Sequence, residues 1–257
     1  ISGGHGMPLQ SLPPDAIYFT VGDNDTFPAL YLQAAEGVRP DVDIVNMSVA
    51  SIVDFPEQLR ARRPAIILSV ISAERVGMLS GLKPATLTVA VEGSESALGV
   101  RREAAADSVT FSPTPMYGTP MPVDAVLFDI LRTNRWRRPI TFATTVGEVA
   151  PWLKPFARLD GLYWRIVPVQ RPAVDIDVLK TNVLRSAYRG FADSSIVLDA
   201  TSRTIGTQYA YTFDRLASAL AAQGDVTTCR AVKARGLATL PSDRLNSSGT
   251  FRETCDR

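Results

Sequence analysis

Short apolar runs near the start of the chain alternate with polar, turn-forming stretches. Residues 16–21 (Ala-Ile-Tyr-Phe-Thr-Val) are mostly β-branched or aromatic, which predicts a buried strand. Residues 41–47 (Asp-Val-Asp-Ile-Val-Asn-Met) predict the next strand. A strand, a helix and a strand within about 30 residues form a βαβ unit, so we expect the two strands to be parallel.

The segment between these strands has the pattern of an amphipathic helix that begins at Thr26. Its apolar residues recur at i, i+3, i+4 and i+7, which predicts one stripe packed on the core. Asp25 or Thr26 can cap this helix. Pro28 suits its first turn and Gly37 suits its end. The stripe consists of Phe27, Leu30, Tyr31 and Ala34.

The later apolar patterns predict more strands and then a run of helices. Strands are predicted at 86–91, 140–146 and 162–167, and helices from 124 onward and at 149–158, 175–188, 203–223 and 225–238. The last two helices meet at Gly224 and form a short-linked antiparallel pair. The apolar stripe of the first helix of the pair is Phe213, Leu216, Ala217 and Leu220.

We therefore expect an α/β fold, with a mostly parallel, three-layer-like sheet domain followed by a C-terminal helical hairpin. Residues 1–12 are expected to be a linker or remnant, 13–170 the α/β domain, 171–241 the helical region and 242–257 a tail. The first seven residues do not have the pattern of a signal peptide, so we expect a piece of a longer chain. The predicted core includes Ile17, Phe19, Leu30, Ile44, Val45, Leu127, Phe128, Phe142, Val167, Leu216 and Leu220.

The composition of the 257 residues narrows the possible functions. Lysine and arginine number 27 and aspartate and glutamate 26, so the net charge of +1 gives no field that would attract nucleic acid. No stretch approaches the roughly 18 consecutive apolar residues of a membrane span. The single histidine, His5, argues against a Ser-His-Asp triad or a multi-histidine zinc site.

The two cysteines, Cys229 and Cys255, leave two alternatives open. They are either two thiols or one disulfide, which in an oxidising compartment would tie the C-terminal tail to a helix. The choice depends on the distance between them, which the sequence does not contain.

The first candidate for a functional site is Gly22-Asp23-Asn24-Asp25-Thr26, where a strand ends and a helix begins. Ligands of open α/β sheets bind at the carboxyl ends of strands, and a helix N-terminus favours anions. Asp23 and Asp25 would favour a divalent cation such as Ca²⁺, Mg²⁺ or Mn²⁺, given further ligands. The alternative is structural, because aspartate and asparagine are common helix caps and turn formers.

A cluster of arginines closes the helix that begins at Asp124. Arginine forks can grip a phosphate, and Trp136 within the cluster could stack on a sugar or on an arginine. The structural alternative is that cations at a helix C-terminus interact favourably with its negative end. The arginines are Arg132, Arg135, Arg137 and Arg138.

Two more groups lie on later strands. If the strand at 140–146 is parallel to the first strand, the hydroxyls of Thr144 and Thr145 lie near Asp23. Trp164, on the last strand, could form a platform for a sugar ring, with packing in the core as the alternative. The glycine-rich phosphate-binding loops of nucleotide- and dinucleotide-binding proteins are absent from the sequence.

Several segments resemble, in order, one known family over about residues 11–245. They include Gly22-Asp-Asn-Asp-Thr-Phe-Pro28, Arg138-Pro-Ile-Thr-Phe-Ala-Thr-Thr-Val146 and Asp160-Gly-Leu-Tyr-Trp-Arg-Ile-Val-Pro168. The chain resembles the soluble C-terminal region, a domain of unknown function, of multi-span membrane proteins related to the protein O-mannosyltransferases. Thr141 stands where that family usually has tyrosine. The final helix pair resembles the tetratricopeptide-like end common in the family.

The resemblance implies a parent glycosyltransferase that uses a polyprenyl-phosphate sugar. Its catalytic acidic residue would lie between membrane helices, so no catalytic residue and no cofactor is carried over to this chain. The implied location is the periplasmic, extracytoplasmic face of a bacterial membrane. The implied partners are the membrane-embedded half of the same polypeptide and a protein acceptor or glycan.

We therefore expect an accessory domain for acceptor or glycan recognition, which does not transfer sugar by itself. The alternative, which rests on the residues alone, is an independent α/β enzyme or a metal- or ligand-binding protein centred on Asp23 and Asp25. A divalent cation is the cofactor that this alternative would use.

Overall fold

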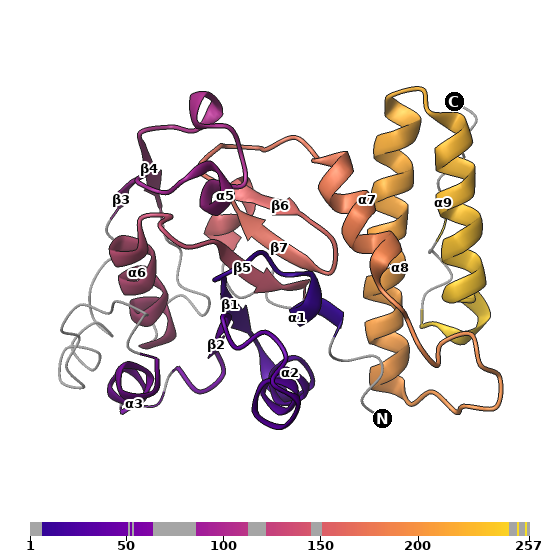
Figure 1. Cartoon of the computed structure of the whole chain (residues 1–257), viewed down its shortest axis with the longest axis horizontal. Helices are drawn as coiled ribbons and strands as arrows, with labels where there is room; N and C mark the ends of the chain where they lie inside the picture. The colour runs from indigo at the N-terminus through magenta and orange to yellow at the C-terminus, as the bar shows by residue number, and fades with distance from the viewer. Residues whose placement is uncertain are drawn as a thin grey trace. The chain divides into compact units, whose positions relative to one another are not determined.

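A five-stranded sheet organises the N-terminal part of the chain in the computed structural model (Figure 1). The structure describes residues 7–50, 52, 54–63, 86–112, 122–144, 151–246, 251 and 255. The strand order in the sheet is β2-β1-β5-β7-β6. Its strands are β1 (Ile17–Thr20), β2 (Asp43–Asn46), β5 (Ile140–Ala143), β6 (Ala157–Leu159) and β7 (Tyr163–Ile166).

Three neighbouring strands of this sheet are parallel, which confirms the prediction from the βαβ pattern. β1 pairs with β2 from Ile17 opposite Asp43 to Thr20 opposite Asn46. β5 pairs with the other side of β1, where Ile17 lies opposite Ile140. β7 is antiparallel to β5. Because β1, β2 and β5 all end at the same edge, the segments that follow them meet there.

A second, smaller sheet and several helices complete the N-terminal part. The second sheet is an antiparallel pair of strands, β3 (Leu87–Ala90) and β4 (Ser108–Phe111). The helix that connects β1 to β2 is α2 (Gly22–Glu36). The other elements are α1 (Met7–Ser11), α3 (Phe55–Arg62), α5 (Glu95–Leu98), η2 (Arg102–Ala104), α6 (Pro122–Asn134) and the 3₁₀ helix η4 (Pro151–Phe156).

The chain divides into two compact units. One contains Leu12–Arg158 and Tyr163–Ala173, and we call it the α/β unit because it holds both sheets. The other contains Ile1–Ser11, Leu159–Leu162 and Val174–Arg257, and we call it the helical unit. An α/β domain followed by a C-terminal helix pair is the fold class that the sequence predicts, and the structure confirms it.

The core of the α/β unit is centred on β1. Tyr18 and Phe19 are buried, and the Phe19 ring stacks on Phe142 of β5 with 4.6 Å between ring centroids. Two residues of the predicted core differ from expectation: Leu30 is exposed and Phe128 is half-buried. The other predicted core residues are buried.

The apolar stripe of α2 does not face the core, so this prediction is wrong. Phe27 is 58% exposed, Tyr31 is 56% exposed and Leu30 is 38% exposed. Ala34 is exposed as well. The buried residues of α2 are Thr26, Ala29 and Leu32.

Polar contacts determine which side of α2 lies against the sheet. The buried hydroxyl of Thr26 lies 2.8 Å from the hydroxyl of Thr20, at the end of β1. Two turns later, Gln33 donates from Nε2 to the carbonyl oxygens of Arg39 and Val42, at 2.8 and 2.7 Å. Leaving such groups unpaired inside the protein would cost free energy. These hydrogen bonds therefore oppose a rotation of α2 that would bury the apolar stripe.

The helical unit is built from α7 (Ile176–Arg185), α8 (Ala200–Ala222) and α9 (Val226–Thr239). α8 packs against both α7 and α9. The turn between α8 and α9 lies at Gly224, whose φ of +80° suits glycine. The aspartates that cap the three helices, each accepting a backbone N–H, are Asp175, Asp199 and Asp225. The apolar stripe of α8 is buried, which confirms its prediction; it consists of Phe213, Leu216, Ala217 and Leu220.

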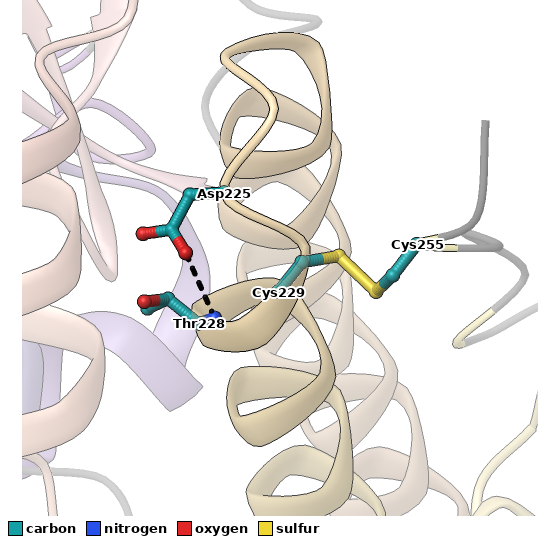
Figure 2. The surroundings of a disulfide bond; sticks show 4 residues. All are labelled: Asp225, Thr228, Cys229 and Cys255. Atoms are coloured by element: carbon teal, nitrogen blue, oxygen red, sulfur yellow. Dashed lines mark hydrogen bonds between the residues drawn. A yellow bond between two sulfur atoms is a disulfide. The ribbon is translucent and has the colours of Figure 1, made fainter.

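A disulfide joins Cys229, in the first turn of α9, to Cys255 (Figure 2). The two Cα atoms are 5.8 Å apart and both residues are buried. Figure 2 also shows the carboxylate of Asp225 accepting the N–H of Thr228, which caps the same turn. Of the two alternatives that the sequence leaves open for the cysteines, the structure has the disulfide.

Candidate functional site

The carboxyl ends of β1 and β5 lie side by side where the connections of the sheet diverge. From β1 the chain passes through α2 to β2 on one side, whereas β5 is followed by β6 and β7 on the other side. In open α/β sheets, ligands bind where adjacent parallel strands have such divergent connections. The residues that follow β1 and β5 are therefore the first candidates for a binding site.

A tight turn leads from β1 into α2 at this edge. Gly22 has a φ of +70°, a backbone conformation that glycine adopts readily. Its N–H donates to the hydroxyl of Ser48, and the N–H of Ser48 donates to Oδ1 of Asn46, both at 2.8 Å. These bonds connect the segments after β1 and β2, so they hold the start of α2 at the edge of the sheet.

The helix begins at Gly22 and not at Thr26, so the predicted caps are wrong. Val21 is the N-cap residue and makes no side-chain cap bond. Asp23 and Asp25 lie inside the first turn, where a carboxylate interacts favourably with the positive end of the helix dipole. The hydroxyl of Thr26 donates back to the carbonyl of Gly22 at 2.7 Å. The positive φ of the glycine is what lets the helix start directly after the strand.

The candidate residues of this first turn differ in exposure. Asp23 and Asn24 are exposed, Asp25 is half-buried and Thr26 is buried. In the part of the chain that the structure describes, no group of three or more His, Cys, Asp or Glu side chains is arranged to hold a metal ion. Cation binding by Asp23 and Asp25 stays a prediction, and it would need oxygen ligands of other kinds.

The exposed side of α2 carries aromatic residues that the sequence reasoning assigned to the core. Asp23, Phe27 and Tyr31 lie at i, i+4 and i+8, so they form one row along the helix. Asn24 and Leu30 lie next to this row. We call these five residues the outer face of α2. The aromatic spacing is visible in the sequence, but it does not tell whether the stripe faces the core or the solvent.

β5 brings Thr144 to the same edge of the sheet. The pairing of Phe19 with Phe142 confirms that β5 is parallel to β1, and Thr144 is half-buried just after the end of β5. Thr145 lies outside the described residues. Trp164 is half-buried on β7, opposite Phe142, and so lies farther from α2, beyond β5.

Arg138 lies at the opposite edge of the sheet, so the structure does not bring it together with Asp23. Its guanidinium donates to the carboxylate of Asp43 at 2.6 Å and to the carbonyl oxygen of Asp15 at 2.9 Å. Asp15 precedes β1, Asp43 begins β2 and Arg138 precedes β5. This side chain, 12% exposed, therefore ties together the amino ends of three parallel strands.

The rest of the arginine cluster contributes ion pairs. Arg135 and Arg137 each lie 2.6 Å from a carboxylate oxygen of Glu92, and their hydrogen bonds lower the pKa of that carboxyl. Trp136 is fully buried, and its Nε1 donates to the carbonyl of Ile166 at 3.0 Å. The indole belongs to the core, so it cannot stack on a sugar as the sequence reasoning considered.

The fold and the site define a class of protein. It is an α/β domain in which the helix after the first strand carries an exposed aromatic surface, and this domain is followed by a helix pair. The chain belongs to the family described as TMEM260-associated domain 2, whose model matches residues 6–64 and 117–186. TMEM260 is a multi-span family related to the protein O-mannosyltransferases, so the resemblance seen in the sequence is confirmed at the level of the family. Searches of curated proteins and of solved structures found no significant match. None of the helices that the structure describes is long and apolar enough to cross a membrane.

Proposed function

We propose that this chain is a non-catalytic accessory domain of a membrane-bound glycosyltransferase of the protein O-mannosyltransferase-like class. In this proposal the parent enzyme uses a polyprenyl-phosphate sugar, and its catalytic residues lie in the membrane-embedded half. The domain recognises the acceptor protein or its glycan on the extracytoplasmic side. Membership of a TMEM260-associated family supports the link to the membrane enzyme. The disulfide supports an oxidising compartment.

The observation that carries the recognition role is the outer face of α2. Two aromatic side chains, Phe27 and Tyr31, are each more than half exposed on α2, the helix that begins at the carboxyl edge of the sheet. Exposed large aromatic residues in a contiguous row mark interaction sites more often than isolated exposed apolar residues do. The row begins with the carboxylate of Asp23 and the amide of Asn24, so it combines apolar surface with hydrogen-bonding groups.

This combination suits a sugar ring. The apolar C–H face of a pyranose stacks on an aromatic ring, and its hydroxyls donate to carboxylate or amide oxygens. Phe27 and Tyr31 are separated by about one helical turn, or about 5.4 Å along the axis, which is comparable to the width of a pyranose ring. Aspartate and glutamate are the only charged residues of α2, which disfavours an anionic lipid surface as the partner.

Sugar titrations followed by NMR test the proposal. The probes are free mannose, mannobiose and, for comparison, galactose. Mannose-containing probes should bind at the outer face of α2, and Phe27→Ala or Tyr31→Ala should weaken that binding about tenfold, or by about 1.4 kcal/mol. Tyr211→Ala is the matched control, because Tyr211 is 46% exposed on α8 in the helical unit.

Two results would contradict the proposal. One is the absence of binding by every sugar probe, and the other is an equal loss in Tyr31→Ala and Tyr211→Ala. A separate experiment tests the non-catalytic role. The purified chain, given a short-chain polyprenyl-phosphate mannose and acceptor peptides, should transfer no sugar. Transfer by this chain alone would reject an accessory role.

A further inference from the structure

We propose that the outer edge of β4 binds an extended polypeptide as an added strand, with side chains of that polypeptide entering a neighbouring cavity. The inference deepens the proposed function and rests on it in one respect: the polypeptide is taken to be a segment of the protein acceptor. The supporting observations are open backbone groups, a bordering cavity and the uncharged lining of that cavity.

One edge of β4 is paired with β3, and no strand among the described residues pairs with the other edge. The N–H of Val91 donates to the carbonyl of Asp107 at 2.9 Å, which makes these two residues a hydrogen-bonded pair of the antiparallel ladder. Hydrogen-bonded and non-hydrogen-bonded pairs alternate along such a ladder. In the observed register, Ser108 and Thr110 are therefore non-hydrogen-bonded positions. Their backbone N–H and C=O groups point away from β3.

Just before β4, the backbone on this outer edge makes one hydrogen bond. The N–H of Ala106, which has the same phase as Ser108 and Thr110, donates to the carbonyl of Pro168 at 3.2 Å. Across the residues that the structure describes, the backbone groups of Ser108 and Thr110 make no hydrogen bond on this edge. Both side chains are exposed. Two successive open positions on a strand edge form a template for pairing with another chain.

A cavity of about 440 Å³ borders this edge. The residues that supply its apolar lining are Ala104, Ala105, Ala106, Val109, Phe156, Pro168 and Val169. Ser108 and Thr110 also contribute to its wall, so the open backbone groups and the cavity belong to one site. Every second side chain of an added strand points in the same direction, and alternate side chains of a bound peptide fill such pockets.

The chemistry of the site selects a polypeptide among possible occupants. Open N–H and C=O groups repeat at about 6.8 Å along the strand edge, which is the two-residue period of another extended backbone. No charged residue lines the cavity, so a phosphate headgroup of a lipid-linked sugar would find no counter-charge there. A neutral segment with small apolar side chains at alternate positions matches both features.

Amide hydrogen exchange of the intact chain tests the proposal. The probe is the capped, uncharged peptide Ac-Thr-Val-Thr-Ala-Thr-Val-Thr-NH₂. Its addition should slow exchange at the amides of Ser108 and Thr110. Thr110→Pro removes one outward N–H without removing a bond to β3, a position where edge strands accept proline. This substitution should weaken peptide binding about tenfold or more.

The matched control is Thr88→Pro. Thr88 lies opposite Thr110 and directs its N–H away from β4, to the outer edge of β3. Peptide binding should survive this change. If Thr110→Pro does not fold, the natural chain is titrated with the same peptide N-methylated at its three central amides, which should not bind. Equal binding of the methylated peptide, equal loss in both proline variants, or no protection by the peptide would overturn the proposal.

Three further outcomes separate the peptide site on β4 from self-association of the chain and from the sugar site on α2. Protection of Ser108 and Thr110 that grows with protein concentration, without peptide, would identify a second copy of the chain as the occupant and overturn the proposal. Peptide binding at β4 together with no sugar binding at α2 would support the peptide site and reject the sugar proposal. Sugar binding without peptide binding would do the reverse.

Discussion

Helices α2 and α8 carry the same kind of apolar stripe but differ in whether they bury it. On α8, Phe213 and Leu216 are fully buried and Leu220 is 3% exposed. On α2, Phe27 is 58% exposed and Tyr31 is 56% exposed. The side of α8 with the stripe packs within a helical bundle, whereas α2 turns a side with Thr26 and Ala29 inward.

The difference shows that helical periodicity in the sequence identifies an apolar face, but does not show whether other residues of the protein cover it. In the helical unit the partner of the stripe is another helix of the same unit. In the α/β unit the hydroxyl of Thr26 and the amide of Gln33 hold the opposite side of α2 in place. Its aromatic row is left exposed, which is why the proposed function is centred there.

The largest expected effect compares the two stripes directly. Phe213→Ala should lower the free energy of unfolding by about 4 kcal/mol, because it opens a cavity in a packed core. Phe27→Ala should change it by no more than about 0.5 kcal/mol, because the side chain is mostly in water. Urea unfolding followed by circular dichroism measures both values. A loss at Phe27 as large as that at Phe213 would place the α2 stripe in a core after all.

The next effect concerns the disulfide, which belongs to the helical unit alone. The bond joins residues separated by 26 positions, and its loss should lower the stability of this unit by about 3 kcal/mol because the unfolded chain gains freedom. The double substitution of Cys229 and Cys255 by serine tests this, with hydrogen exchange read separately in the two units. Equal loosening of the sheet would contradict a stabilisation confined to the helical unit.

The corresponding test for the α/β unit removes the ion pair between Arg138 and Asp43 at the amino ends of the strands. Arg138→Ala should destabilise the unit by about 2 kcal/mol, because among the described residues it leaves the buried carboxylate of Asp43 with only Arg63, 3.5 Å away. Arg137→Ala is the control, and the loss of its solvent-screened pair with Glu92 should destabilise the unit far less. Similar losses in the two variants, measured by urea unfolding, would remove the distinction between a structural and a surface arginine.

A smaller effect compares the starts of the two helices. Asp199 caps α8 by accepting the N–H of Ser202 at 2.6 Å, and Asp199→Ala should cost about 1 kcal/mol. The first turn of α2 has no side-chain cap, so Asp23→Ala should remove only a dipole interaction of about 0.5 kcal/mol. Thermal unfolding of both variants measures the difference. A larger loss for Asp23→Ala would indicate a capping role that the structure does not contain.

The smallest effect is a pH dependence in the connection from α2 to β2. A hydrogen bond from the Arg39 guanidinium lowers the pKa of Asp41 from 3.8 to about 2. A lowered pKa means that this stabilisation is complete above 3.8 and is lost as the pH falls through about 2. Asp41→Asn should therefore flatten the acid side of the stability curve slightly, since the carboxylate is 40% exposed. An unchanged acid transition would contradict this.

Local chemistry was enough to predict most of the elements. The run at 16–21 gives β1, and Gly37 ends α2 with a φ of +64°, because these features depend on side-chain shape and backbone freedom within a few residues. The parallel pairing of β1 and β2 followed from the length of the connection between them. The turn at Gly224 and the buried stripe of α8 followed in the same way.

The sequence by itself thus determined most of the helices and strands, the parallel start of the sheet and the family, although it placed a helix over 149–158 where the structure has η4 and β6. Only the tertiary structure decided that α2 shows its aromatic row to solvent and that Arg138 lies across the sheet from Asp23. It also decided that, among the described residues, one edge of β4 has no paired strand. The physical reason is the separation in sequence over which each effect acts. Propensity and periodicity act between neighbours in the chain, whereas exposure and unpaired backbone groups depend on residues brought together from distant positions.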